Sequence, residues 1–220
     1  NRCTTIDQSV CSELASLFGC AITTGFGVVE NNAQIKMGES VVVFGAGGVG
    51  LNIIQASALY SAYPIIAVDI FDNRLDLAKE MGATHLLNSK FCNVFDEIRK
   101  ILKNKNLDVF IDNTGNTGII EKGYQIISDK GRLILVGVPK LGQNINIFTL
   151  PLHFGKTITG SHGGESNPTN DIPRYLNLFN QERAKYKKLI TERYTLDNIN
   201  DAIDNMKKGK TAGRILIEML

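Results

Sequence analysis

A glycine-rich turn and a distant carboxylate carry the strongest chemical signal in this sequence. Residues 45–50 read Gly-Ala-Gly-Gly-Val-Gly, which matches GxGxxG, and Asp69 follows nineteen residues after the last glycine. In this pattern the first glycine permits a tight turn, the second lets the backbone approach a pyrophosphate, and the third allows a helix to pack closely on a strand. Unpaired N–H groups at the helix start would face the phosphates, and Asp69 would accept hydrogen bonds from a ribose. The pattern predicts a dinucleotide site.

Two other interpretations share this pattern and stay open at this stage. A nucleoside ligand such as S-adenosylmethionine uses a similar sheet with an acid on its ribose. A tight turn between a strand and a helix can also bind nothing, with Asp69 as a solvated strand end. The context favours the dinucleotide, because the turn directly follows an apolar run and a second apolar run ends in the acid.

Cysteine and histidine spacing gives no sign of a complete metal site. The four cysteines stand at positions 3, 11, 20 and 92, without the closely spaced pairs that structural zinc sites use. Disulfides are unusual in intracellular chains of this size, so we expect mostly buried thiols. The histidines His85, His153 and His162 do not have metal-ligand spacing either.

The elements that must position these residues alternate regularly. Short apolar runs rich in branched side chains predict strands at 40–44, 65–69, 85–88, 107–112, 131–138 and 157–161. Helical periodicity lies between them, from the glycine turn to about residue 60 and at 73–81, 94–102 and 117–127. Nearly continuous apolar strands joined by helices are typical of a parallel sheet covered on both faces. We predict an α/β fold with a doubly wound, six-stranded parallel sheet.

The two flanks of this unit are less regular. Residues 9–30 predict helices interrupted at Gly19 and Gly25, and residues 163–220 predict a polar stretch, then helix, then a strand at 214–219. The basic stretch 183–193 is expected to be a solvated helix face. The last strand must pair either with the main sheet or with a domain outside this chain.

Composition excludes several classes of protein. The chain has 220 residues, 43% of them hydrophobic and 21% charged, which suits one globular domain with at most a small appendage and excludes charge-driven disorder. A net charge of +2 without basic tracts gives no reason to expect nucleic-acid binding. No apolar run approaches the ~20 residues of a membrane helix, and no signal peptide opens the sequence. We expect a soluble, cytoplasmic protein.

Several longer strings together resemble a known family, the zinc-containing medium-chain alcohol dehydrogenases. They lie at residues 19–27, 43–51, 67–69, 78–84, 136–139 and 212–214. The sequence is most similar to the branch that includes glutathione-dependent formaldehyde dehydrogenase, and the resemblance spans essentially the whole chain. It implies an oxidoreductase that moves hydride between an alcohol or aldehyde and NAD, with zinc polarising the substrate oxygen.

The resemblance also implies roles for matching positions. Cys20 matches a catalytic-zinc ligand, although a lone cysteine at a helix end is more often a buried apolar residue. Arg214 matches an arginine that reaches the pyrophosphate, and Arg74 a basic residue near the adenosine ribose. Asp112 and Thr114 follow the fourth strand, at the ligand crevice of an open sheet, where we expect Asp112 to cap the strand end. The other implied coenzyme-binding residues are Thr24, Val136, Val138 and Ser161 at the nicotinamide end, and Gly45, Gly47, Gly48, Val49 and Gly50 at the pyrophosphate.

Part of the implied enzyme lies outside this chain. Residues 1–20 would be a remnant of the catalytic domain and a linker helix, 21–162 the NAD-binding domain, and 163–220 a segment that returns to the catalytic domain. The family's remaining zinc ligands, proton relay and structural-zinc lobe lie N-terminal to this region. We therefore interpret the chain as a fragment of a zinc-dependent alcohol dehydrogenase that is inactive alone. The alternative is a stand-alone NAD(H)-binding module, either a redox sensor or an assembly domain.

Two finer expectations concern assembly and coenzyme choice. The family's coenzyme domains dimerise through an edge strand, so residues 144–150 are the expected contact of a homodimer. The charge on Asp69 would repel the 2′-phosphate of NADP, because like charges at ~4 Å cost about 4 kcal/mol at an effective dielectric of 20. Arg74 could accommodate that phosphate, but it is farther away. We expect NAD to be preferred.

Overall fold

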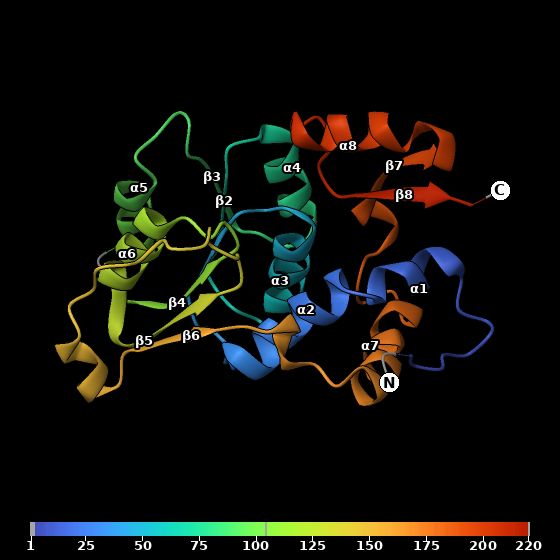
Figure 1. Ribbon diagram of the computed structural model, residues 1–220. Coiled ribbons are helices and arrows are strands. Elements are labelled where there is room, and N and C mark those ends of the chain that lie inside the picture. Colours follow the sequence, from blue (N-terminus) through green and yellow to red (C-terminus); the bar gives the residue numbers. More distant parts are fainter. Residues whose placement is uncertain (1–2, 104, 220) are drawn as a thin grey trace.

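A six-stranded parallel sheet forms the centre of the computed structural model, which describes residues 3–103 and 105–219 (Figure 1). The strand order is β3-β2-β1-β4-β5-β6, with every neighbouring pair parallel. The strands are β1 (Val41–Phe44), β2 (Ile65–Asp69), β3 (His85–Asn88), β4 (Leu107–Asp112), β5 (Ile127–Leu135) and β6 (Thr157–Gly160). The predicted doubly wound α/β fold is confirmed.

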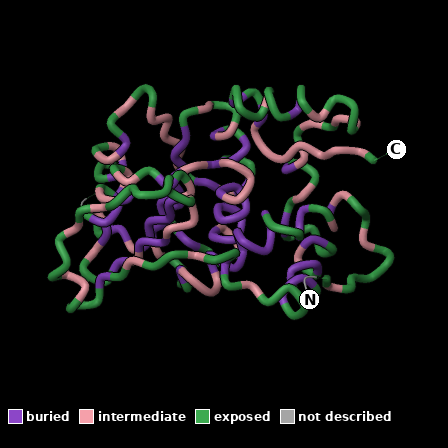
Figure 2. The backbone as a smooth tube through the Cα atoms, viewed as in Figure 1, coloured by how far each residue is buried: buried purple, intermediate pink, exposed green. Residues whose placement is uncertain are grey.

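Helices cover both faces of this sheet, and the strand side chains alternate between two apolar clusters. Val41 and Val43 of β1 point into one cluster with α3 (Gly48–Leu59) and α4 (Asp72–Glu80). Val42 and Phe44 point into the other, with α5 (Val94–Leu102) and α6 (Thr117–Ile126). Because both faces are covered, the inner strands are mostly apolar, and the carboxylates Asp69 and Asp112 stand at strand ends. Figure 2 shows the buried core in purple.

The N-terminal flank differs from its prediction at one glycine. Helix α1 (Ser12–Phe18) ends before Gly19 as expected, but α2 (Ala21–Gly27) runs straight through Gly25 and continues as a single π-helical turn, Val28–Asn32. A Cβ at Gly25 would lie 2.5 Å from the Cβ of Asn52 on α3. Gly25 therefore allows α2 and α3 to pack closely, and the prediction that it interrupts the helix was wrong.

The C-terminal flank forms a second, two-stranded sheet. After α7 (Pro168–Asn180) come β7 (Ile190–Thr195), α8 (Ile199–Lys207) and β8 (Arg214–Glu218), and β7 pairs with β8 in parallel. The last strand was predicted to pair either with the main sheet or with a domain outside this chain. It does neither, because it pairs with β7 of the same chain. The predicted solvated helix at 183–193 is also wrong, because its second half is β7, where exposed and half-buried residues alternate.

The four cysteine thiols are more accessible than their spacing led us to expect. Cys3, Cys11 and Cys20 are exposed and Cys92 is half-buried, so the expectation of mostly buried thiols is wrong.

Within 3–103 and 105–219, no single helix has the length and apolar character to cross a membrane. Only the bent pair Ser12–Phe18 and Ala21–Asn32, with a 51° angle between its parts, passes on length and composition.

Candidate functional site

A cavity of about 480 Å³ opens at the carboxyl ends of β1, β2 and β4. The strand order reverses there, because the chain leaves β1 toward β2 and β3 and returns as β4 on the other side. Ligands of open α/β sheets bind at such a switch point. Its lining residues are Phe44, Gly45, Gly47, Gly48, Val49, Gly50, Val68, Asp69, Ile70, Arg74, Ser89, Asn113, Thr114, Ile119 and Arg214.

The glycine turn at this cavity has the backbone that its spacing predicts. Gly45 has φ +95°, which strongly favours glycine, and a Cβ on Gly50 would overlap the carbonyl oxygen of Gly45. Gly47 has nothing within 4 Å on its Cβ side, so its backbone is open to a ligand. Helix α3 begins at Gly48, and its first N–H groups have no partner within the helix. The turn can therefore hold a phosphate group.

Asp69 is buried at the end of β2, with an exposed fraction of 5%. Its Oδ2 accepts a hydrogen bond from the Ala46 N–H of the glycine turn at 2.8 Å, and its Oδ1 accepts from the N–H groups of Ile70 at 2.7 Å and Phe71 at 3.1 Å. Arg74 Nη1 lies 3.8 Å from Oδ2. An ionised carboxylate offers about four acceptor positions, so one stays open for a hydroxyl group.

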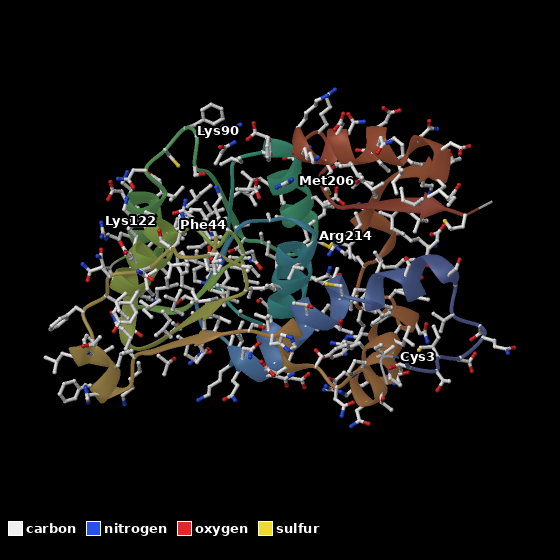
Figure 3. The ribbon with its side chains drawn as sticks, in the orientation of Figure 1. Cys3, Phe44, Lys90, Lys122, Met206 and Arg214 are labelled. Atoms are coloured by element: carbon white, nitrogen blue, oxygen red, sulfur yellow. The ribbon has the colours of Figure 1, made fainter. Side chains whose placement is uncertain are left out.

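Three side chains at the cavity hold buried polar atoms with no hydrogen-bond partner: Nε of Arg74, Nε of Arg214 and Oδ1 of Asn113. Arg214 lies against the start of α3, so closely that a Cβ on Gly48 would overlap its guanidinium. Figure 3 labels it beside α3. No ion pair of Arg214 occurs within 3–103 and 105–219. The guanidinium of Arg214 and the first N–H groups of α3 therefore place positive charge at the glycine turn, which suits an anionic group.

Asp112 holds the turn that follows β4 and is fully buried. Its carboxylate accepts hydrogen bonds from Thr114 Oγ1 at 2.6 Å, Thr114 N at 3.1 Å and Gly115 N at 2.8 Å. Burial raises the pKa of this carboxyl above its ordinary value, and the three hydrogen bonds oppose that rise by favouring the charged form. The expected capping role of Asp112 is confirmed. Its neighbour Asn113, which sequence reasoning missed, lines the cavity instead.

The structure brings together the predicted pyrophosphate and ribose residues but not the nicotinamide group. Thr24 is buried in α2, and Ser161 donates its N–H to the Leu135 carbonyl. Val136 packs against the core, and Val138 is 90% exposed. These four residues do not line the 480 Å³ cavity. Ser89 and Ile119 line it, and no sequence signal marked them.

Cys20 lies on a neighbouring surface, where a second cavity of about 360 Å³ also contacts Arg214 and β8. The Cys20 Sγ is 4.0 Å from Thr24 Oγ1. Across the described part of the chain, no group of three or more histidine, cysteine, aspartate or glutamate residues could hold a metal ion. A catalytic zinc needs three protein ligands and an open position. The residues that the structure describes therefore do not fit a zinc ion by themselves.

Known proteins match this fold and sequence closely. The family model for zinc-binding dehydrogenases matches residues 48–181. S-(hydroxymethyl)glutathione dehydrogenase from Paracoccus denitrificans is 32% identical over 90% of this chain and 55% of its own length. A zinc-binding-domain alcohol dehydrogenase from Burkholderia ambifaria superposes with a TM-score of 0.91 at 34% identity, covering 99% of this chain and 58% of the other. Benzyl alcohol dehydrogenase from Acinetobacter calcoaceticus also superposes with a TM-score of 0.91. The two sequences are 33% identical, and the match covers 99% of this chain and 59% of the other.

The chain spans about half the length of the relatives that it matches. The matched part contains the glycine turn, the six-stranded sheet and the crevice between β1 and β4. The chain belongs to the zinc-binding dehydrogenase family and corresponds to its C-terminal, coenzyme-binding part.

Proposed function

We propose that this chain binds NAD and, together with a zinc-bearing catalytic domain, forms an NAD-dependent alcohol dehydrogenase. One observation carries the proposal: the guanidinium of Arg214 lies against the glycine turn with a buried, unpartnered Nε. That arrangement suits a diphosphate held between a cation and a helix start.

Each part of the crevice has a role in holding the coenzyme. The N–H groups at the start of α3 and the guanidinium of Arg214 hold the pyrophosphate. Asp69 accepts a hydrogen bond from an adenosine ribose hydroxyl, and its contact with Ala46 ties the ribose subsite to the phosphate turn. Bound NAD supplies the hydride acceptor for oxidation of an alcohol. Thr24, Val136, Val138 and Ser161 would surround the nicotinamide, in a region that needs the second domain to close.

The domain boundaries and the metal belong to the same proposal. Residues 21–162 would form the NAD-binding domain, with 1–20 and 163–220 contacting the catalytic domain. Cys20 would supply one thiolate to a zinc site whose other ligands are provided by that domain. An alcohol or aldehyde is the proposed substrate class, and the cytoplasm the proposed location.

A homodimer is proposed through the side of the sheet that ends with β6. Residues 144–150 form no strand here; Ile145 and Ile147 pack against the core, while Phe148 is 70% exposed and Leu150 52%. These exposed apolar side chains next to an edge strand suit a contact with a second copy. Light scattering at increasing concentration tests this, and a monomer at every concentration would contradict it.

A second candidate is a nucleotide-binding module without catalysis. The observation in its favour is that the residues proposed for the pyrophosphate and the ribose all line one cavity of this chain, whereas Cys20 has no companion ligand among the described residues. Sequencing the coding region before Asn1 separates the two candidates. A preceding domain with closely spaced cysteines supports the enzyme, and a start codon at this position supports the module.

Titration of NADH into wild type and Arg214→Ala tests the main proposal. Losing a hydrogen-bonded charge contact costs about 1.5–3 kcal/mol, so we expect Arg214→Ala to bind NADH roughly 10- to 150-fold more weakly. Lys207→Ala is the matched control, because Lys207 is an exposed cation on nearby α8 with no contact to the cavity. Equal affinity of Arg214→Ala and wild type would contradict the proposal.

A further inference from the structure

We propose that Phe71 is a positioning residue for Arg214: its ring fixes the segment 209–214 so that the guanidinium lies over the glycine turn. The inference rests on the proposed function, in which Arg214 holds the diphosphate. Phe71 itself does not line the coenzyme cavity, so its effect on a bound nucleotide would be indirect.

The first contact joins Phe71, the residue just before α4, to Gly209, just after α8. Gly209 is buried with φ +69°, and a Cβ on it would overlap the edge of the Phe71 ring. The ring therefore lies directly on the Gly209 backbone. Only glycine combines this left-handed conformation with such a close approach. Figure 1 shows the start of α4 and the end of α8 side by side.

A second contact holds the same backbone. The side-chain amide of Asn73 donates to the carbonyl oxygens of Gly209 at 3.4 Å and Lys210 at 3.2 Å. The Gly209 backbone thus contacts the Phe71 ring, and its carbonyl accepts from the Asn73 amide, so both contacts come from the N-terminal end of α4. Residues 209–213 form no helix or strand, so these contacts, with the buried Thr211, set the path into β8.

Two cations contact the Phe71 ring, and one of them, Arg74, also lines the coenzyme cavity. The Arg74 guanidinium carbon lies 4.8 Å from the ring centroid and Lys90 Nζ lies 4.7 Å from it, both at cation–π distance. The backbone N–H of Phe71 donates to Asp69, whose other oxygen accepts from Ala46 in the glycine turn.

These contacts form a closed circuit of residues beside the crevice. It runs from the glycine turn through Asp69 and Phe71 to Gly209, then along five residues to Arg214, which returns to the turn at Gly48. Arg214 begins a strand of the small second sheet, so the main sheet does not position it. Within the small sheet Arg214 pairs with Ile190 of β7, and the contact between Phe71 and Gly209 fixes the segment that leads into this strand against the first turn of α4.

The test compares Phe71→Ala with Phe91→Ala, a matched control whose ring is 77% exposed on the β3–α5 loop. The probes are NAD, ADP and adenosine. Because only NAD and ADP carry a diphosphate, we expect Phe71→Ala to weaken both by about tenfold, the size of one charge-assisted contact. Adenosine binding should change little, and Phe91→Ala should behave as wild type. An equal loss of adenosine affinity would overturn the inference, because Phe71 would then act on the adenosine directly.

A double-mutant cycle with Arg214→Ala gives a sharper result. If Phe71 acts through Arg214, adding Phe71→Ala to Arg214→Ala should not weaken ADP binding further, whereas independent effects would multiply. Phe71→Tyr keeps the ring and should restore ADP affinity. If Phe71→Ala does not fold, Asn73→Ala tests the same segment from its other contact. Normal ADP binding in Asn73→Ala and in a folded Phe71→Ala would overturn the inference.

The outcomes also separate this inference from the proposed function. A wild-type chain that binds neither NAD nor ADP, or an Arg214→Ala variant with unchanged affinity, contradicts the proposed function. Diphosphate binding that depends on Arg214 but not on Phe71 contradicts only the role of Phe71.

Discussion

The coenzyme crevice and the surface around Cys20 share Arg214 but are built very differently. At the crevice, β1 and β2 are buried along their whole length, and three backbone N–H groups fix the Asp69 carboxylate. At the other surface, β8 is half-exposed at every position and the Cys20 thiol is exposed. In the proposed function the crevice supplies the phosphate and ribose contacts, whereas the Cys20 surface supplies only one of the metal ligands. On that proposal, nucleotide binding and alcohol oxidation depend on different regions of this chain.

The largest expected effect is a complete absence of catalysis by the chain alone. One thiolate cannot fix the geometry of a catalytic zinc, and one wall of a cleft cannot hold an alcohol against the nicotinamide. Assays with NAD, zinc and short, long or hydroxymethyl-thiol alcohols should show no turnover, while NADH still binds. Cys20→Ala should leave NADH affinity unchanged. Zinc-dependent turnover that disappears in Cys20→Ala would show that the two regions are not separable.

Overpacking the glycine turn should remove most of the nucleotide affinity. In Gly50→Val the added side chain meets the Gly45 carbonyl, and forcing such groups apart costs about 1–3 kcal/mol. We expect the melting temperature to fall for that reason. NADH binding should weaken by roughly 10- to 150-fold, because a displaced turn loses a charge-assisted contact to the phosphates worth about 1.5–3 kcal/mol. Gly160→Ala is the control, since nothing lies within 4 Å of its Cβ position. Full NADH affinity in Gly50→Val would mean that the phosphates bind elsewhere.

Coenzyme choice should depend on Asp69. Its charge at the ribose end disfavours a 2′-phosphate, and Arg74 only partly offsets it at 3.8 Å. Wild type should bind NAD more tightly than NADP, and Asp69→Ser should narrow the difference by about tenfold, or 1.4 kcal/mol. Calorimetric titration of both coenzymes into both proteins measures this. Equal affinities of wild type for NAD and NADP would contradict the role of Asp69 in coenzyme choice.

The smallest effect is an acid-dependent loss of stability far from the crevice. Arg174 donates to both oxygens of Glu30, at 2.5 and 2.8 Å, and holds the pKa of that carboxyl below its ordinary value. A depressed carboxyl stabilises the fold above its unfolded pKa of about 4.3, and this contribution is lost as the pH falls through the lower folded value.

Because Arg174 is half-exposed, this pair should contribute less than about 1 kcal/mol, and salt should reduce it further. Melting temperatures of wild type and Glu30→Gln should converge below pH 4 and differ by a few degrees at pH 7. NADH affinity at pH 7 should be equal in the two proteins. A constant difference in melting temperature at every pH would contradict the ion-pair explanation.

Local sequence patterns predicted the crevice well. The bounds of β2, β3, β4 and α5 match their prediction to the residue, because each is a short apolar or amphipathic run with clear breaks. The glycine turn and Asp69 were predicted for the same reason: their roles depend on backbone conformation at fixed spacing. The nicotinamide residues remain predictions, because Thr24, Val136, Val138 and Ser161 lie outside the cavity.

What the sequence could not reveal depends on contacts between distant segments. Strand β7 contains Glu192 and Arg193 and follows three lysines, so its charge obscured a strand that exists because β8 pairs with it. Gly25 and Gly209 resemble ordinary helix breakers in the sequence, yet both make room for another segment, Asn52 in one case and Phe71 in the other. Asn113 carries no local signal, because its unpartnered oxygen is defined only by what surrounds it.

The position of Arg214 also has a consequence for motion. The glycine turn belongs to the six-stranded sheet and Arg214 to the two-stranded one, so a diphosphate between them would connect two separately hydrogen-bonded units. A ligand that binds only the joined arrangement stabilises it by mass action, and local opening of the smaller unit then becomes rarer. Amide hydrogens of β7 and β8 would exchange with solvent more slowly as NADH is added, although the nucleotide touches neither strand beyond Arg214.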